Sequence, residues 1–175
     1  MDQVSVDVLA DRGKQEYDRG NYPAAADLFG QAAHAYTTSK DELNAAEMRN
    51  NQSVALLQAG KAKEALQATE GTEAVFEKTG DRKRQGIAVS NRAAALEGLR
   101  RWDEALAEYD RAAALFEEAG EGDMHSIVRK AAANINLKRG RITDSQMDVF
   151  DSLRLVEKPT LMQRIMKFLM RIGFR

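Results

Sequence analysis

Apolar residues recur along the chain with the three-to-four-residue spacing of amphipathic helices, and short polar interruptions divide this pattern at regular intervals. Four turn-like positions recur at one constant interval, at Gly20, Gly60, Arg100 and Gly140. On each side of every such position the apolar spacing predicts one helix. We therefore expect helices near residues 5–19, 22–38, 42–59, 62–79, 82–99, 102–119, 123–139 and 142–156.

Two other positions of this period hold only small side chains. Seven residues before each turn come Gly13, Ser53, Ala93 and Ala133, and five residues after it come Ala25, Ala65, Ala105 and Ser145. Small residues at matched positions allow two helices to cross closely, since larger side chains would push the axes apart. The pattern predicts a series of stacked helix pairs, with repeats at about 5–40, 41–80, 81–120 and 121–156.

The segment from Gly20 to Ala32 carries the spacing Gly-x-Tyr-x-x-Ala-x-x-x-Phe-x-x-Ala, and residues 101–112 repeat it with Trp and Tyr at the aromatic positions. In this spacing the chain resembles the tetratricopeptide repeat family over residues 5–156. The resemblance implies an all-α fold, a right-handed superhelix of three to four helix pairs. Because the family's usual period is about 34 residues, a period of 40 implies its long-helix variant.

The resemblance also implies a binding surface. In this family the first helix of each repeat lines a concave groove. The residues that this register places there are Asp11, Lys14, Asn50, Asn51, Val54, Asn91, Glu97 and Asn134. Asn51 and Asn91 stand where such proteins often use asparagine to hold a ligand's backbone, for which the amide supplies a donor and an acceptor. The alternative is that these amides bond a neighbouring helix or water.

One version of the family grips a C-terminal carboxylate with lysine and arginine side chains. Here Asn50, Val54, Ile127 and Ala131 stand where its cationic and amide partners should be, which disfavours that function. Cations appear elsewhere instead: Arg49 takes an apolar position, and the leucine position eight residues before the turn holds Arg12, Gln52 and Arg92. Such long side chains either extend past the core to water or place charge in the groove.

Residues 157–175 differ from the rest of the chain. The whole sequence has a net charge of −1, but residues 158–175 contain five basic side chains and no acidic one, so residues 1–157 carry −6. We expect residues 1–156 to form the repeat domain and residues 157–175 a basic amphipathic helix. The residues of this tail that we expect to act in binding are Arg164, Lys167, Phe168, Met170 and Arg171.

Three roles for the tail stay open at the level of sequence. It can cap the last repeat, because the end of a solenoid needs a cover. It can lie on an anionic membrane surface, where apolar burial and headgroup attraction act together. It can instead dock on a partner helix, on a second copy of the chain to give a homo-oligomer, or in the chain's own acidic groove.

The sequence offers no constellation for catalysis. There is no cysteine, and the two histidines, His34 and His125, stand at different positions of different repeats with no second ligand at helical spacing. We interpret both as ordinary surface or interface residues, and we expect neither metal nor cofactor. A nucleic-acid partner is disfavoured because the repeat region is acidic.

These observations favour a non-enzymatic scaffold that binds a peptide or helix of another protein. The alternative is a peripheral membrane adaptor, or a self-associating protein, that uses residues 157–175. The N-terminal residues lack the basic start and apolar run of a secretory signal, so we expect a cytoplasmic protein, either free or peripheral at the membrane.

Overall fold

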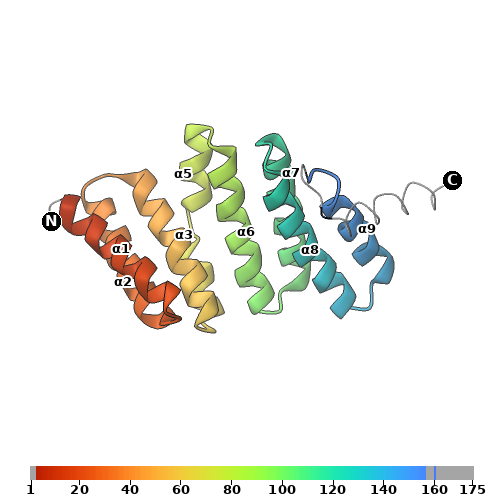
Figure 1. Cartoon of the computed structure of the whole chain (residues 1–175), viewed down its shortest axis with the longest axis horizontal. Helices are drawn as coiled ribbons and strands as arrows, with labels where there is room; N and C mark the ends of the chain where they lie inside the picture. The colour runs from red at the N-terminus through yellow and green to blue at the C-terminus, as the bar shows by residue number, and fades with distance from the viewer. Residues whose placement is uncertain (1–2, 157–159, 161–175) are drawn as a thin grey trace.

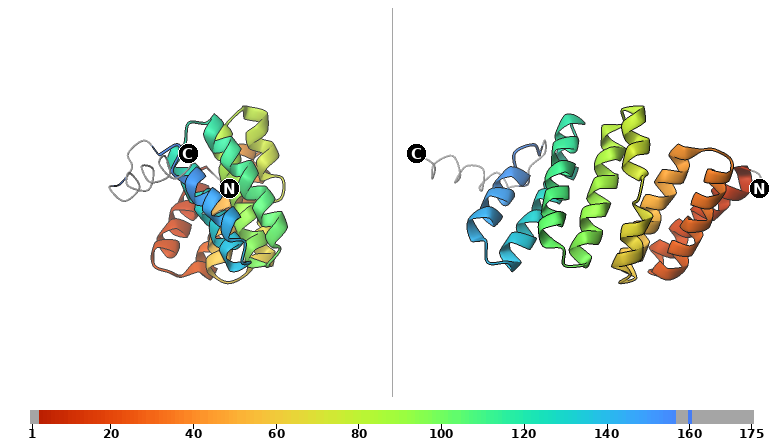
Figure 2. Two further views of the ribbon diagram at one scale, coloured as in Figure 1. Left: turned by 90° about the vertical axis from the view of Figure 1, so that its right-hand side faces the viewer. Right: turned by 180° about the vertical axis from the view of Figure 1, so that it is seen from behind.

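The computed structural model describes residues 3–156 and residue 160. Its helices stand side by side along the long axis of the molecule (Figures 1 and 2). Most of them pack on the helices before and after them in the chain, whereas α4 and α5 both pack on α3 and α6. Among these residues there are helices and turns but no strand. The helices are α1 (Gln3–Asp18), α2 (Tyr22–Thr38), α3 (Glu42–Gln58), α4 (Ala62–Ala68), α5 (Thr72–Thr79), α6 (Arg82–Gly98), α7 (Trp102–Glu118), α8 (Gly122–Lys138) and α9 (Ile142–Ser152). The predicted all-α repeat superhelix is confirmed.

The turns between successive helices recur at even spacing, and one residue at each junction takes a left-handed backbone conformation. At the end of α1, Gly20 has φ +79°, and the amide of Asn21 donates to the carbonyl of Glu16 at 2.9 Å. This closure of a helix end needs a positive φ, which glycine adopts without strain. Arg100 takes the same conformation with φ +59°, so this turn keeps its geometry without a glycine, although a side chain is disfavoured there.

Small side chains fill the crossings between helices, as the repeat pattern predicts. Ala25, Ala65 and Ala105 are completely buried, and a Cβ atom added to Gly13 would lie 2.8 Å from the ring of Phe29. Buried Ser53 donates its hydroxyl to the carbonyl of Ala65 at 2.9 Å, which ties α3 to α4. The close approach of these helices therefore depends on side chains no larger than serine.

The predicted single helix over 62–79 is wrong. The structure has two shorter helices, α4 and α5, separated by Gly71 with φ +75°. The hydroxyl of Thr69 donates to the carbonyl of Leu66 at 2.7 Å, and that of Thr72 donates to the carbonyl of Thr69 at 2.9 Å. These side-chain bonds compete with the helical backbone bonds, and the glycine allows the chain to turn. The tail of the sequence, residues 157–175, lies outside the described residues except for exposed Thr160.

Candidate peptide-binding groove

The first helices of the repeats are α1, α3, α6 and α8, and they form one side of the superhelix. We call the surface of this side the first-helix groove. A pocket of about 430 Å³ lies on this side between α1 and α3. The residues that line it are Ala10, Asp11, Lys14, Tyr17 and Asp18 of α1, Phe29 of α2, and Met48, Asn51 and Val54 of α3. The structure therefore brings together four of the residues that the register places in the groove, namely Asp11, Lys14, Asn51 and Val54.

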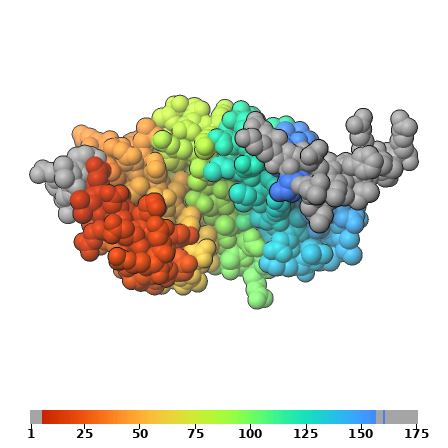
Figure 3. Space-filling view, viewed as in Figure 1, coloured from red at the N-terminus to blue at the C-terminus, as the bar shows by residue number. Residues whose placement is uncertain are grey.

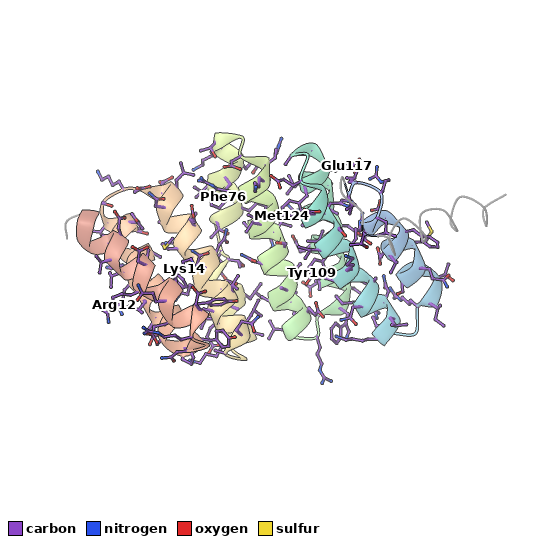
Figure 4. All side chains as sticks on the ribbon, in the orientation of Figure 1. Arg12, Lys14, Phe76, Tyr109, Glu117 and Met124 are labelled. Atoms are coloured by element: carbon purple, nitrogen blue, oxygen red, sulfur yellow. The ribbon has the colours of Figure 1, made fainter. Side chains whose placement is uncertain are left out.

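The floor of this pocket is apolar and its rim is polar. Phe29 and Met48 are 6% and 8% exposed, and they close the bottom between α1 and α3. Lys14, labelled on α1 in Figure 4, pairs through its Nζ with a carboxylate oxygen of Asp18 at 3.1 Å on the exposed rim. The arrangement suits an apolar side chain held below a polar backbone.

The other residues predicted for the groove lie apart from this pocket. Asn91 is half-buried on α6, and Asn134 is exposed on α8. Glu97 accepts a hydrogen bond from the hydroxyl of Tyr109 at 3.0 Å and pairs with Lys138 at 3.5 Å, so it links α6 to α7 and α8. Asn50 is only 5% exposed, which leaves its side chain little surface to offer a partner.

Burial and the neighbouring carboxylate of Glu97 raise the pKa of Tyr109 well above its ordinary value. Desolvation disfavours the phenolate, and a second negative charge beside it would repel it. Tyr109 therefore keeps its proton at every physiological pH, and its hydroxyl donates this proton in the hydrogen bond to Glu97 of α6.

The arginine at a leucine position of α6 is held by acidic residues from both sides. The guanidinium of Arg92 donates to Glu73 of α5 at 2.8 Å and to Glu108 of α7 at 2.7 Å, and Arg111 binds the same two carboxylates at 2.5 and 2.8 Å. Burial raises the pKa of Glu73, but the hydrogen bond from Arg92 and the charge of Arg111 outweigh it, so the pKa lies below its ordinary value. Sequence spacing did not reveal these partners, because they come from two other helices, α5 and α7.

A second charged cluster surrounds His125, which is buried at 1% exposure and is thus not a surface residue. Its Nε2 lies 3.4 Å from a carboxylate oxygen of Asp151, and the Nε of Arg129 lies 2.6 Å from the same oxygen. Burial lowers the pKa of His125, and the charges of Arg129 and Arg154 add to this, against the opposite effect of Asp151 and Glu117. The imidazole is therefore kept neutral near pH 7.

Nothing in the described part of the chain resembles a metal centre, since no three His, Cys, Asp or Glu side chains gather there as ligands. No described helix is long and apolar enough to cross a membrane. The sequence missed Met48 as a pocket residue. It stands twelve residues before the turn, outside the positions that the resemblance assigns to the groove.

Comparison with known proteins agrees with this architecture. A tetratricopeptide repeat family model matches residues 11–72, which include the pocket between α1 and α3. BtubC (BKLC) from P. vanneervenii has a crystal structure similar to this chain, with a TM-score of 0.75 and 15% sequence identity. The similarity covers 97% of this chain but less than two thirds (65%) of BtubC, and at this identity it shows the shared fold alone. No curated protein sequence matches the chain.

Proposed function

We propose that this tetratricopeptide repeat protein is a non-enzymatic scaffold that binds a peptide or helix of a partner protein in the first-helix groove. Tetratricopeptide repeats generally mediate protein–protein interactions, and the family is typically made of scaffolds without catalytic activity. The observation that carries the proposal for this chain is the pocket between α1 and α3, which has an apolar floor and a polar rim.

The pocket defines the chemistry of a suitable ligand. An apolar side chain of the partner enters between Phe29 and Met48, whose flexible thioether adapts to different shapes. The side-chain amide of Asn51 then binds the partner's backbone, both as donor and as acceptor. Asn91, one period later on α6, offers the same groups to the next part of an extended segment. The partner is thus a protein segment with an apolar residue flanked by accessible backbone.

Removing both amides tests this mode of binding. In Asn51→Ala with Asn91→Ala, we expect the partner recovered by affinity pull-down to bind roughly tenfold more weakly, because each lost hydrogen bond is worth about 0.5–1.5 kcal/mol. The dissociation constant is measured by isothermal titration calorimetry with the purified partner. The matched control is Gln15→Ala, an exposed amide of α1 outside the pocket. Equal affinity of the double variant and the control for every recovered partner would contradict the proposal.

A second candidate function rests on the sequence of residues 157–175. Its basic and apolar residues favour a peripheral membrane adaptor whose tail binds an anionic surface while the repeats recruit a partner, or a protein that self-associates through this segment. A cytoplasmic location fits both the scaffold and the adaptor, and it stays a prediction.

A further inference from the structure

Three arginines extend from first helices toward the second helices on the opposite side of the superhelix: Arg49 of α3, Arg92 of α6 and Arg129 of α8. Two of them are neutralised from both flanking helices. Arg92 binds carboxylates of α5 and α7, as described above. Arg129 binds Asp110 of α7 at 2.5 Å and Asp151 of α9 at 2.6 Å, with Asp148 at 3.6 Å.

Arg49 has no such compensation. Its guanidinium donates to the hydroxyl of Thr37 at 3.4 Å, a long hydrogen bond, and no carboxylate of the described residues lies within 4.0 Å of it. An arginine that is half-buried without a counter-charge has lost part of its hydration and gained little in return. The side chain is therefore ready to bind an anionic group from outside.

The repeat register explains why the counter-charges are missing. Arg129 follows Arg49 by two periods of the repeat. At the same displacement, Gly30 corresponds to Asp110, Ala68 to Asp148 and Gly71 to Asp151. At the repeat positions equivalent to the three acidic residues around Arg129, the chain thus has glycine or alanine. These residues lack both the charge and most of the side-chain volume.

Open space lies on both sides of Arg49, and the side chain of Gln52 occupies the space next to Gly30. Two adjoining pockets, of about 640 and 530 Å³, are both lined by Arg49 and Gln52. The first faces α2 and the second faces α4. We call this surface the Arg49 groove, and the residues that line it besides Arg49 and Gln52 are Asp27, Gly30, Gln31, Ala33, His34 and Thr37 on α2, Leu56 on α3, and Glu64, Gln67, Ala68 and Glu70 on or next to α4.

The charges at the margin restrict what can enter. Asp27, Glu64 and Glu70 are exposed lining residues of this groove, and none of them pairs with Arg49. They would repel a strongly acidic segment, but they would attract cations on either side of a single carboxylate. His34, also exposed, is the other titratable side chain that lines the α2 side.

We propose that the Arg49 groove binds a partner-protein segment that carries one acidic side chain flanked by basic residues, and that the carboxylate pairs with Arg49 in place of the missing aspartates. This surface lies on the second-helix side, so it is distinct from the first-helix groove. A guanidinium and a carboxylate form paired, charge-assisted hydrogen bonds, which gives the contact its geometry. The scaffold thereby holds two partner segments on separate helix faces.

The test compares two short synthetic peptides with blocked ends, one with a central glutamate between two lysines and one with glutamine in its place. Binding to the full chain is followed by nuclear magnetic resonance of the arginine Nε–Hε groups. We expect the Arg49 resonance to shift, and the glutamate peptide to bind about fivefold or more tightly than the glutamine peptide, which corresponds to about 1 kcal/mol for an exposed charge pair.

Two variants at one position supply the matched control. Gly30→Asp places a carboxylate where Asp110 stands beside Arg129, so we expect it to abolish the preference for the glutamate peptide. Gly30→Asn has nearly the same volume without the charge, and it should keep the preference. A Cβ at position 30 would meet only the flexible end of Gln52, at 2.6 Å, so both variants can be accommodated. Gly30→Asp should also melt at a higher temperature than Gly30→Asn.

Several results would overturn the proposal. The first two are equal binding of the two peptides and no binding of either peptide at millimolar concentration. The other two are a preference for the glutamate peptide that persists in Arg49→Gln, and one that persists in Gly30→Asp. Asn51→Ala should leave the preference unchanged, which separates this site from the first-helix groove.

Discussion

At the scale of single residues, first helices of the repeats carry arginine side chains whose charge is met by other helices. Arg92 and Arg129 extend from first helices, yet each ends among carboxylates of the flanking second helices. The network stays near the surface, with 25% of the Arg92 side chain exposed. Its contribution to stability is therefore modest, and its geometric effect is to fix the spacing of α5, α6 and α7.

His125 should make the stability of the protein depend on pH. Its pKa is lower in the folded protein than in the unfolded chain, chiefly because of burial, so the unfolded state binds more protons as the pH falls. The contribution of His125 to the free energy of unfolding should be complete above about pH 6.5. Below that pH it should decrease, by at most about 1.4 kcal/mol per pH unit. Urea denaturation between about pH 7.5 and about pH 5.5 measures this slope.

The other histidine provides the control. In His125→Asn this part of the pH dependence should disappear, whereas in His34→Asn, which alters an exposed residue, it should persist. A slope that is the same in wild type and in His125→Asn would show that the histidine does not carry it.

At the scale of helices, the second repeat departs from its neighbours. Where α2 and α7 run unbroken for 17 residues each, the corresponding segment is divided into α4 and α5. Figure 1 shows α5 beside α6. Glu73 of α5 pairs with Arg92, and Gly71, where the helix is divided, stands two periods before Asp151.

Gly71→Ala tests how much this division depends on the backbone. No atom lies within 4 Å of the added Cβ, so the whole effect comes from the positive φ of +75°. We expect the free energy of unfolding to fall by about 1 kcal/mol, as for other non-glycine residues in the left-handed region. Chemical denaturation measures the change, with Glu70→Ala as a neighbouring exposed control.

An unchanged stability of Gly71→Ala would mean that α4 and α5 can merge into the single helix that the sequence pattern predicts. Circular dichroism would then detect added helix in the variant. A loss of stability without added helix supports the division that the structure shows.

At the scale of the whole molecule, the superhelix presents different chemistry on its two sides. Figure 3 shows one face, along which the segments follow one another from the N-terminal to the C-terminal part of the chain. The first-helix side offers an apolar pocket with asparagine above it, and the second-helix side offers an arginine without a counter-charge. Exposed Leu137 and Ile142 lie in the fourth repeat, at 60% and 61% exposure.

Residues 159–175 are the segment whose role decides between scaffold and membrane adaptor. If this basic segment anchors the protein, the intact chain should sediment with vesicles that contain anionic lipid, and a 1–158 truncation should stay in solution, because apolar burial and headgroup attraction are both lost. Neutral vesicles serve as the control for charge. Equal sedimentation of the intact and truncated chains would exclude anchoring by the tail.

The sequence by itself determined the repeat, because small residues and turn residues return every 40 positions and each acts through local backbone geometry or close crossing of neighbouring helices. The resemblance to the tetratricopeptide repeat family implied a groove position for Asp11, Lys14, Asn51 and Val54, and the structure gathers these four residues in one pocket.

Only the tertiary structure decided the break at Gly71, the burial of His125 and the carboxylates around Arg92 and Arg129. Each of these depends on side chains from separate helices, which no single helical period relates. The lack of a carboxylate partner for Arg49 also required the structure, because it is recognised by comparison with Arg129, which pairs with Asp110 and Asp151.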